Sequence, residues 1–496
     1  MQCRYYIIEG MDKTFFFYDL ETSGLNQRYD RIMQFAGQRT DMELNPIGEP
    51  VNVLVKMTDD ALPSPSAIMV TKITPQQTLA DGVSEAEFCR FVTEEVFVPN
   101  TIAVGYNTVR FDDEFMRATM WRNFYDPYEW EWKDGRSRWD MLDVVRLTRA
   151  LRPEGINWPF TDEGKPTNRL ELITKLNGLK HEHAHDALSD VYATIAVAKI
   201  IRDKQPELFN YLLKMRDKRE VKKLVNLDNK KPFVYASGRY ANEYNKTTVV
   251  VPLTVGRNGN VLVYDLRYNL EKILPVDGSC QALSPPISQA QWGSPSAPVT
   301  RLAGDLRKSP VKNTNSSLFP TVKELCYNKC PAVAPLGVLE SANGWEKIGL
   351  TLEQVQKNLN TLMAHPEFAE QMRTKWENQP EFPPAEEPEL ALYDGFLNDR
   401  DRIKVAAVRN ADANRLADFH PDFDDARLPE LLLHYKGRNF PESLSESENE
   451  KWQAYRRARL QKQAEKFLKE LEACQVRDEF IAEELRLYFE SLANYD

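Results

Sequence analysis

Apolar residues in the first 200 positions alternate between short unbroken runs and longer stretches with helical spacing. Short apolar runs between polar residues are typical of buried strands, whereas apolar residues three and four apart predict amphipathic helices. The runs predict strands over 14–20, 31–39, 51–55 and 101–105, and the spaced patterns predict helices over 84–97, 113–123, 170–176 and 186–201. Strands that alternate with helices in this way predict an α/β domain over residues 14–203.

The pattern changes twice beyond that domain. Residues 214–231 carry eight basic side chains against three acidic ones and mark a boundary. Apolar runs over 247–255 and 260–266 then flank the turn residues 257–259 and predict a β-hairpin. Helical periodicity returns over 390–492. The expected units are a β domain over 204–365 with a Ser/Pro-rich insertion near 278–315, a Pro/Glu-rich linker over 366–390, and a helical domain over 391–496.

Composition narrows the class of protein. The 496 residues exceed a single core and favour about two to four domains. A formal net charge of -10 argues against nonspecific coating of nucleic acid by the whole surface, so any DNA binding requires local basic patches. The six cysteines are scattered, and Cys326 with Cys330 alone is a weak zinc motif. No apolar run reaches 18 residues, and we therefore expect a cytoplasmic protein without a membrane segment.

Three separate segments carry acidic residues in a pattern that points to metal chemistry. Asp19 and Glu21 end the first apolar run, and residues two apart on a strand face the same side. Asp112 follows in the second segment, and His185 with Asp190 in the third. Phosphodiester hydrolysis needs an activated water, charge neutralisation and a stabilised leaving oxygen, and two Mg²⁺ ions held by carboxylates supply all three.

Each acid has an expected role in that chemistry. Asp19 is expected to bridge two ions and Glu21 to hold one of them near the terminal nucleotide. Asp112 and Asp190 complete the ligand set. His185 precedes the last helix of the domain and is the expected general base, because an imidazole accepts a proton near neutral pH.

An Asp-x-Glu pair on a strand is by itself more often a solvated acidic pair than a metal site. The combination is more specific, because Asn107 stands five residues before Asp112 and His185 stands five residues before Asp190. A tyrosine-type active site would place Tyr at position 186, where this chain has Asp186. The histidine type is therefore favoured.

These segments resemble the DEDDh 3′→5′ exonucleases of the ribonuclease H-like superfamily, whose five motif positions match Asp19, Glu21, Asp112, His185 and Asp190. Longer stretches resemble the bacterial exodeoxyribonuclease I family, among them 105–107, 122–128, 151–158, 190–194, 328–331, 392–396 and 435–441.

The resemblance implies an α/β ribonuclease H-like exonuclease domain, then an SH3-like β domain and a C-terminal α-helical domain. It also implies a monomer that removes 5′-mononucleotides processively from the 3′ end of single-stranded DNA in repair and recombination. The expected cofactor is two Mg²⁺ ions, which Mn²⁺ can replace. A 3′→5′ exoribonuclease or proofreading exonuclease on the same fold stays an alternative, as does a noncatalytic DNA-binding scaffold.

Seven aromatic residues lie between positions 121 and 139, interleaved with basic ones. Bases of a single strand stack on such rings, although each ring could equally belong to the core. By analogy with the family's DNA path, Tyr128 and Trp132 are the expected exposed members. Arg169 precedes the helix over 170–176 and is an expected phosphate contact. Arg117 and Arg146 are further candidates that could instead form surface ion pairs.

The resemblance also implies a protein partner. Members of the family bind the acidic, hydrophobic C-terminal tail of the single-stranded DNA-binding protein, and Arg152 and Tyr211 match positions associated with that pocket. Residues 332–341 lack a basic side chain and carry Glu340 where relatives contribute a basic group.

Overall fold

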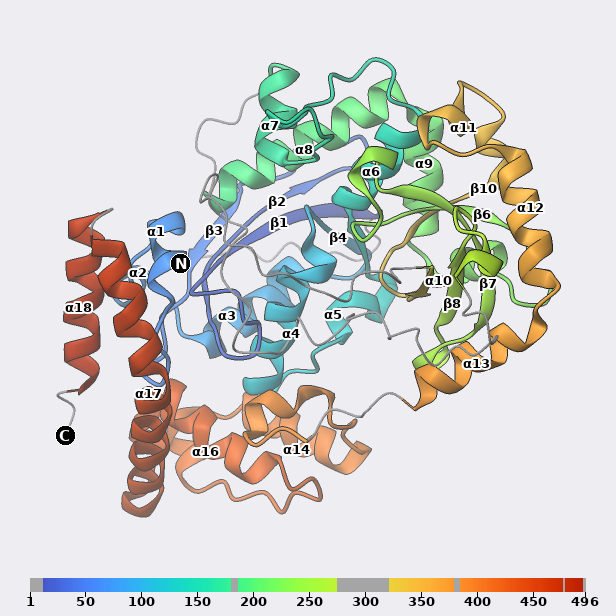
Figure 1. Ribbon diagram of the computed structural model, residues 1–496. Coiled ribbons are helices and arrows are strands. Elements are labelled where there is room, and N and C mark those ends of the chain that lie inside the picture. Colours follow the sequence, from blue (N-terminus) through green and yellow to red (C-terminus); the bar gives the residue numbers. More distant parts are fainter. Residues whose placement is uncertain (1–11, 180–185, 274–320, 379–383, 476–477, 494–496) are drawn as a thin grey trace. The chain divides into compact units, whose positions relative to one another are not determined.

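A computed structural model describes residues 12–179, 186–273, 321–378, 384–475 and 478–493. His185 and the predicted insertion at 278–315 lie outside these residues. The chain divides into two compact units (Figure 1), the first formed by 1–138, 181–192 and 383–496 and the second by 139–180 and 193–382. Each unit is described separately below.

The first unit is built on a five-stranded sheet in the order β3-β2-β1-β4-β5. Its strands are β1 (Thr14–Thr22), β2 (Ile32–Thr40), β3 (Val51–Leu54), β4 (Thr101–Gly105) and β5 (Ser137–Asp140), the last two residues of β5 being counted with the second unit. The central strand β1 pairs with β2 in antiparallel and with β4 in parallel orientation. The first three predicted strands are confirmed to within two residues at each end, and β4 matches its predicted range.

Helices cover this sheet, among them α3 (Glu85–Phe91), α4 (Asp112–Arg122) and the short α5 (Glu129–Trp132). Phe16, Tyr18 and Phe35 of the sheet share one apolar core with Phe88 of α3 and Phe115 of α4. The helix predicted over 84–97 begins as expected, because the Ser84 side chain caps it. It ends early, and a π-helical turn follows at Val92–Val96.

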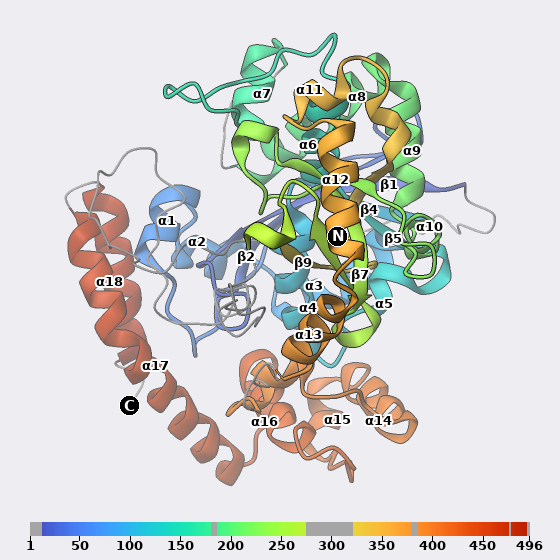
Figure 2. The ribbon, with the colours of Figure 1, turned by 45° about the vertical axis from the view of Figure 1, so that its right-hand side comes forward.

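The C-terminal part of the first unit is helical, as predicted. Its helices are α14 (Asp399–Arg409), α15 (Ala413–Ala417), α16 (Leu428–Asn439), α17 (Glu446–Gln475) and α18 (Glu479–Ala493). Figures 1 and 2 show α17 and α18 beside α1 (Pro65–Thr71) and α2 (Pro75–Asp81), and Ile68 of α1 shares an apolar core with residues of α17 and α18. Distant parts of the sequence therefore fold as one body here.

A buried cluster of charged side chains also joins the two ends of the chain. Arg31 and Asp60, which are fully buried, form an ion pair at 3.1 Å. Glu389 pairs with Arg31 at 3.3 Å and with Arg438 at 2.7 Å, and it also bonds Arg459. Because ions out of water require close partners, this cluster fixes the C-terminal helices against the sheet.

The second unit contains an antiparallel sheet in the order β10-β6-β7-β8-β9. Its strands are β6 (Phe233–Ala236), β7 (Thr247–Val255), β8 (Val261–Asp265), β9 (Val322–Leu325) and β10 (Ala332–Pro335). Its helices are α6 (Met141–Leu151), α7 (Leu170–Leu176), α9 (Pro206–Met215), α10 (Lys218–Leu224), α11 (Gly344–Lys347), α12 (Leu352–Met363) and α13 (Pro366–Glu377). The hairpin β7–β8 confirms the prediction, as does α7.

The first part of the segment assigned to a linker, 366–390, is helical instead. Phe368, Met372 and Trp376 recur every four residues along α13 and are all buried, which anchors the helix on the second unit. The proline content of 380–388 dominated the prediction for the whole segment. Among the described residues, no helix has the length and apolar character needed to cross a membrane.

Candidate active site

The site begins where the two parallel strands β1 and β4 end. Pairing between them stops at Phe17 and Val104, so Asp19 and Glu21 extend beyond the last paired residues. Tyr18 lies in the apolar core, and strand alternation turns Asp19 to the opposite face. Both carboxylates therefore stand at the carboxyl edge of the sheet, where α/β proteins commonly place ligands.

The chain leaving β4 returns an acid to the same edge. It passes close to β1 at Gly105, where a Cβ atom would lie 2.8 Å from the carbonyl oxygen of Tyr18. Only glycine allows that approach. The chain then enters α4, whose first residue is Asp112, and Oδ1 of Asp112 accepts a hydrogen bond from the Leu20 amide at 3.2 Å. Asp112 is thus bonded to the backbone between Asp19 and Glu21.

Helix α8 (Ala187–Lys204) supplies the third acidic segment. The Asp186 carboxylate accepts a hydrogen bond from the Ser189 amide at 3.0 Å and so caps the helix. Asp190 stands in the first turn, and its amide bonds the Asp186 carbonyl at 3.0 Å. The acidic side chain at 186 also contributes negative charge to the site, as described next.

Three acids from these segments meet. Asp19, Glu21 and Asp190 each present a carboxylate oxygen, and the three oxygens lie within 4.8 Å of one another. Burial and the neighbouring Asp190, Asp112 and Asp186 raise the pKa of Glu21 to about 9. Burial and the same neighbourhood also raise the pKa of Asp19 well above its ordinary value. Carboxylates that repel one another this strongly require a counterion, and hard divalent cations are the natural one.

The residues therefore fit a divalent cation. Three acids predicted as ligands come together, and the fourth, Asp112, is 4% exposed and bonded beside them. Asp186 was not predicted to contribute charge to this site. An aspartate immediately before a helix indicates a helix cap, but nothing in the sequence around Asp186 indicates that it lies near Asp19 and Glu21.

The predicted DNA-contacting aromatics divide between core and surface. Trp121, Phe124, Trp130 and Trp139 are buried, whereas Trp132 is 64% exposed. Tyr128 is partly buried. The expectation of an exposed Trp132 is confirmed, and most of the other rings are core, which was the alternative interpretation.

Arg117 is more constrained than a free phosphate contact would be. It donates to Glu131 at 2.5 and 3.0 Å and to Glu114 at 2.8 Å. Its guanidinium also lies 5.3 Å from the centre of the Tyr128 ring. Arg117 therefore orients Tyr128 through a cation–π contact.

Two aromatic residues that sequence reasoning did not select stand beside this group. The Tyr393 hydroxyl bonds Glu114, and Phe396 is 84% exposed with its ring centre 6.3 Å from that of Tyr128. The exposed ring of Phe396 beside the partly buried ring of Tyr128 forms the kind of surface on which nucleic-acid bases stack. No periodicity or spacing could have related position 396 to position 128.

The other basic candidates belong to the second unit. Arg169 is exposed and pairs with Glu171, and Arg146 donates to Asp143 at 2.6 Å. The partner candidate Arg152 donates to Ser341 Oγ at 2.8 Å. Burial raises the pKa of Tyr211 to about 12. The structure places Arg152 beside the chain that follows β10, within one unit.

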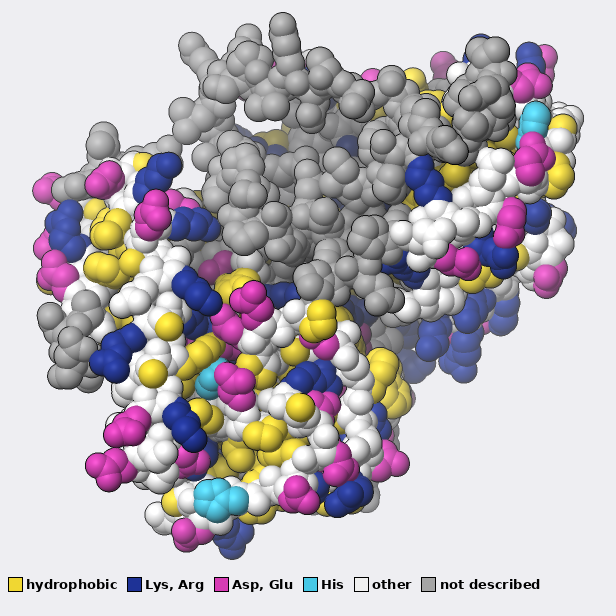
Figure 3. Space-filling model, turned by 60° about the horizontal axis from the view of Figure 1, so that its bottom comes forward, with side chains coloured by type: hydrophobic (Ala, Val, Ile, Leu, Met, Phe, Trp, Pro, Cys, Tyr) yellow, Lys and Arg dark blue, Asp and Glu magenta, His cyan; other side chains and the backbone are white. Residues whose placement is uncertain are grey.

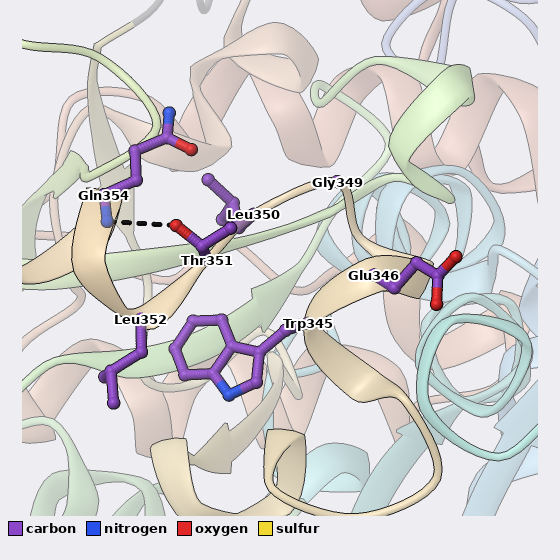
Figure 4. Close-up of a pocket in the computed structure, with 7 residues that line it drawn as sticks. All are labelled: Trp345, Glu346, Gly349, Leu350, Thr351, Leu352 and Gln354. Carbon is purple, nitrogen blue, oxygen red and sulfur yellow. Dashed lines mark hydrogen bonds between the residues drawn. The ribbon is translucent and has the colours of Figure 1, made fainter.

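A separate pocket of about 510 Å³ lies in the second unit and is lined by Trp345, Glu346, Gly349, Leu350, Thr351, Leu352 and Gln354 (Figure 4). The Thr351 side chain caps α12, because its Oγ1 accepts a hydrogen bond from the Gln354 amide at 3.1 Å. None of its lining residues belongs to the acidic group, and one carboxylate alone cannot hold two ions. This pocket does not carry the chemistry.

Known proteins match this chain along nearly its whole length. Three family models match it, described as "Exonuclease" over 16–198, "Exonuclease I SH3-like domain" over 216–280 and 307–378, and "Exonuclease I C-terminal domain" over 386–495. Exodeoxyribonuclease I of Haemophilus influenzae is 40% identical over 460 residues, covering 92% of each chain.

Solved structures agree with that match. A crystal structure of Escherichia coli exonuclease I in complex with a dA16 oligonucleotide has a TM-score of 0.86 and 34% identity, covering 97% of this chain and 100% of that one. A zinc-bound form of the Escherichia coli enzyme with single-stranded DNA has a TM-score of 0.87 and 34% identity, covering 98% and 100%. The predicted fold class is confirmed. With the acidic group at the edge of the first sheet and these likenesses along the chain, the protein belongs to the exodeoxyribonuclease I family.

Proposed function

We propose that this protein is a processive, divalent-metal-dependent exonuclease that removes 5′-mononucleotides from the 3′ end of single-stranded DNA. The observation that carries the proposal is the meeting of Asp19, Glu21 and Asp190 within 4.8 Å, in a chain that is 40% identical to a named exodeoxyribonuclease I. A role in DNA repair and recombination is proposed with it, and the family membership supports that role.

The proposed cofactor is a pair of Mg²⁺ ions, with Mn²⁺ as a substitute. Bound there, the ions would activate a water and stabilise the leaving oxygen. Asp19, Glu21, Asp112 and Asp190 are the proposed ligands. Burial together with the neighbouring acids raises the pKa values of Asp19 and Glu21, and a bound cation would compensate both effects, which supports that assignment.

His185 is the proposed general base. Only Asp186 separates His185 from the first residue of α8, so His185 is close in sequence to the helix that carries Asp190. A neutral imidazole would take the proton of the attacking water, and its loss should lower the cleavage rate about 10²- to 10⁴-fold.

For the nucleotides behind the 3′ end, the proposed stacking surface consists of Trp132, Tyr128 and Phe396. The exposure of Trp132 and Phe396 supports this, since a ring with most of its surface in solvent is available to bases. Arg146 and Arg169 are proposed to contact phosphates. Arg117 is proposed to contribute to DNA binding through Tyr128, which lies under its guanidinium. On the C-terminal helical part of the face in Figure 3, basic side chains are mixed with acidic ones, which favours local rather than general attraction of DNA.

Further proposals concern partner, assembly and compartment. Arg152 and Tyr211 are proposed to bind the C-terminal tail of the single-stranded DNA-binding protein, and the protein is proposed to act as a monomer. The protein is also proposed to act in the cytoplasm, where its proposed DNA substrate would be found. Among the described residues, Cys89, Cys326, Cys330 and Cys474 form no disulfide, which suits that reducing compartment.

The test compares a single-stranded oligodeoxynucleotide labelled at its 3′ end with one labelled at its 5′ end, each with and without Mg²⁺. We expect immediate release of a labelled mononucleotide from the 3′-labelled strand and a shortening ladder from the 5′-labelled strand. Asp19→Ala and Asp190→Ala should abolish both while DNA binding persists. Glu49→Ala, an exposed acid on the same unit, is the matched control.

Equal digestion of RNA would favour the exoribonuclease alternative. Full activity of Asp19→Ala would refute the metal assignment, and an inactive wild-type protein would favour a noncatalytic scaffold.

A further inference from the structure

Next to each of two proposed metal ligands stands a residue that the mechanism does not use. Tyr18 precedes Asp19 on β1, and Asp113 follows Asp112 at the start of α4. The Tyr18 hydroxyl donates to Oδ1 of Asp113. Tyr18 and Asp113 are 2% and 1% exposed, so this bond is shielded from water.

A second bond connects the same two elements. The Leu20 amide of β1 donates to Asp112 of α4 at 3.2 Å. Strand β1 and helix α4 are thus joined at two points, one on the ligand side and one on the core side. A helix fixed at two points against a strand cannot rotate its first turn, which is the turn that carries Asp112.

The buried charge of Asp113 is balanced away from the acidic group. Arg138, at the end of β5 that lies in the first unit, donates to Oδ2 of Asp113. Arg138 is 6% exposed and also pairs with Glu131 at 3.1 Å, which in turn holds Arg117. Both oxygens of Asp113 are therefore engaged by side chains, and the carboxylate has a defined orientation.

We infer that Asp113 is a positioning residue for the metal site: through Tyr18 and Arg138 it fixes α4 against β1, so that Asp112 faces Asp19. Groups that orient metal ligands tune the metal site, and their loss typically costs about 10- to 100-fold in metal affinity or activity. This inference rests on the proposed function, because it takes Asp19 and Asp112 as metal ligands.

The test replaces Asp113 by asparagine, which keeps the shape but loses the charge that pairs with Arg138. Two readouts are measured. One is binding of Mn²⁺ to the DNA-free protein, followed by the electron paramagnetic resonance signal of free Mn²⁺, and the other is the Mg²⁺ concentration that gives half-maximal cleavage. The dissociation constant for Mn²⁺ and the half-maximal Mg²⁺ concentration should both rise about 10- to 100-fold for Asp113→Asn. The KM for single-stranded DNA at saturating Mg²⁺ should stay close to the wild-type value.

The matched control is Glu85→Gln. Glu85 is another carboxylate of the first unit with only 2% exposure, and it pairs with Arg122 at 2.6 Å on the packing surface of α3 and α4. Its replacement should lower thermal stability but leave Mn²⁺ binding unchanged. A purely structural role for Asp113 would make the two variants alike.

Tyr18→Phe removes a single hydroxyl and decides the question if Asp113→Asn does not fold. It should raise the metal requirement in the same direction by a smaller factor. Wild-type Mn²⁺ binding in whichever of these variants is folded would overturn the inference. Asp19→Ala is measured alongside: its retained cleavage would overturn the proposed metal site, whereas its inactivity with unchanged metal binding in Asp113→Asn would overturn the positioning role alone.

Discussion

The acidic group should lower the stability of the metal-free protein, although cleavage requires it. Replacing Glu21 by glutamine should abolish cleavage yet stabilise the metal-free protein. Burial and the neighbouring acids raise the pKa of Glu21 from 4.5 to about 9, so the folded chain holds a proton there that the unfolded chain releases. Glutamine carries no such proton and no such penalty.

The size of the effect can be worked out in two ways. In the folded protein Glu21 keeps its proton at pH 7, although the pKa of the unfolded chain is 4.5. The difference of about 2.5 pH units, at about 1.36 kcal/mol per unit, lowers the free energy of unfolding by about 3 kcal/mol. If Glu21 were ionised instead, two carboxylate charges no more than 4.8 Å apart would repel by at least 332/(20 × 4.8), or about 3.5 kcal/mol, at an effective dielectric constant of about 20. Either state of Glu21 therefore carries a penalty of about 3 kcal/mol at pH 7, which glutamine removes.

The pH dependence follows from linkage. A group whose pKa is raised by folding binds more protons in the folded state between the two pKa values, so stability falls as pH rises from 4.5 towards 9. The advantage of Glu21→Gln should therefore be absent at pH 4, clear at pH 7 and larger at pH 8. Saturating Mg²⁺ should reverse the order, because only the wild-type protein has the full ligand set.

Differential scanning calorimetry in EDTA, from pH 4 to pH 8, measures this difference directly. Glu49→Gln, an exposed glutamate of the same unit, is the control and should track the wild-type protein at every pH. A melting-temperature difference between Glu21→Gln and wild type that is constant over the range, or a variant less stable than wild type in EDTA at pH 8, would refute the reasoning.

Three further predictions concern the same unit. Burial and the nearby Arg438 lower the pKa of His434 from 6.5 to about 4. The protein should therefore lose stability as the pH falls from 6.5 to 4, by about 2 kcal/mol at pH 5. In urea unfolding, the His434→Phe variant should not show this loss of stability at low pH. Arg438→Met leaves Asp60 without its 2.8 Å partner and should cost about 3–5 kcal/mol, read from urea unfolding, whereas an unchanged midpoint would contradict a tightly paired cluster. Trp132→Ala and Phe396→Ala should each weaken binding of a single-stranded oligonucleotide by about 1–3 kcal/mol, or about 5- to 150-fold, in fluorescence anisotropy with EDTA. Phe480→Ala, which removes an equally exposed ring on α18, should bind normally, and an equal loss there would contradict a specific stacking surface.

Local patterns determined much of the fold. The apolar run that forms β1 and the Ser84 cap that begins α3 act on neighbouring residues, so their positions could be predicted. The order of the acids along the chain likewise predicted one metal site, because few residue types have side chains that can hold two divalent cations. The prediction failed where proline content competed with burial, as in α13, whose apolar face is defined only by the sheet it packs on.

Tertiary structure alone decided the environment of the acids. Whether a ring between 121 and 139 is core or surface depends on which neighbours cover it, and Trp130 and Trp132 differ only in that respect. The pairing of Tyr18 with Asp113 spans 95 residues of sequence. Sequence by itself specified which groups could bind metal, but the strength of their repulsion and the orientation of Asp112 arise from distances and burial, which exist only once the chain has folded.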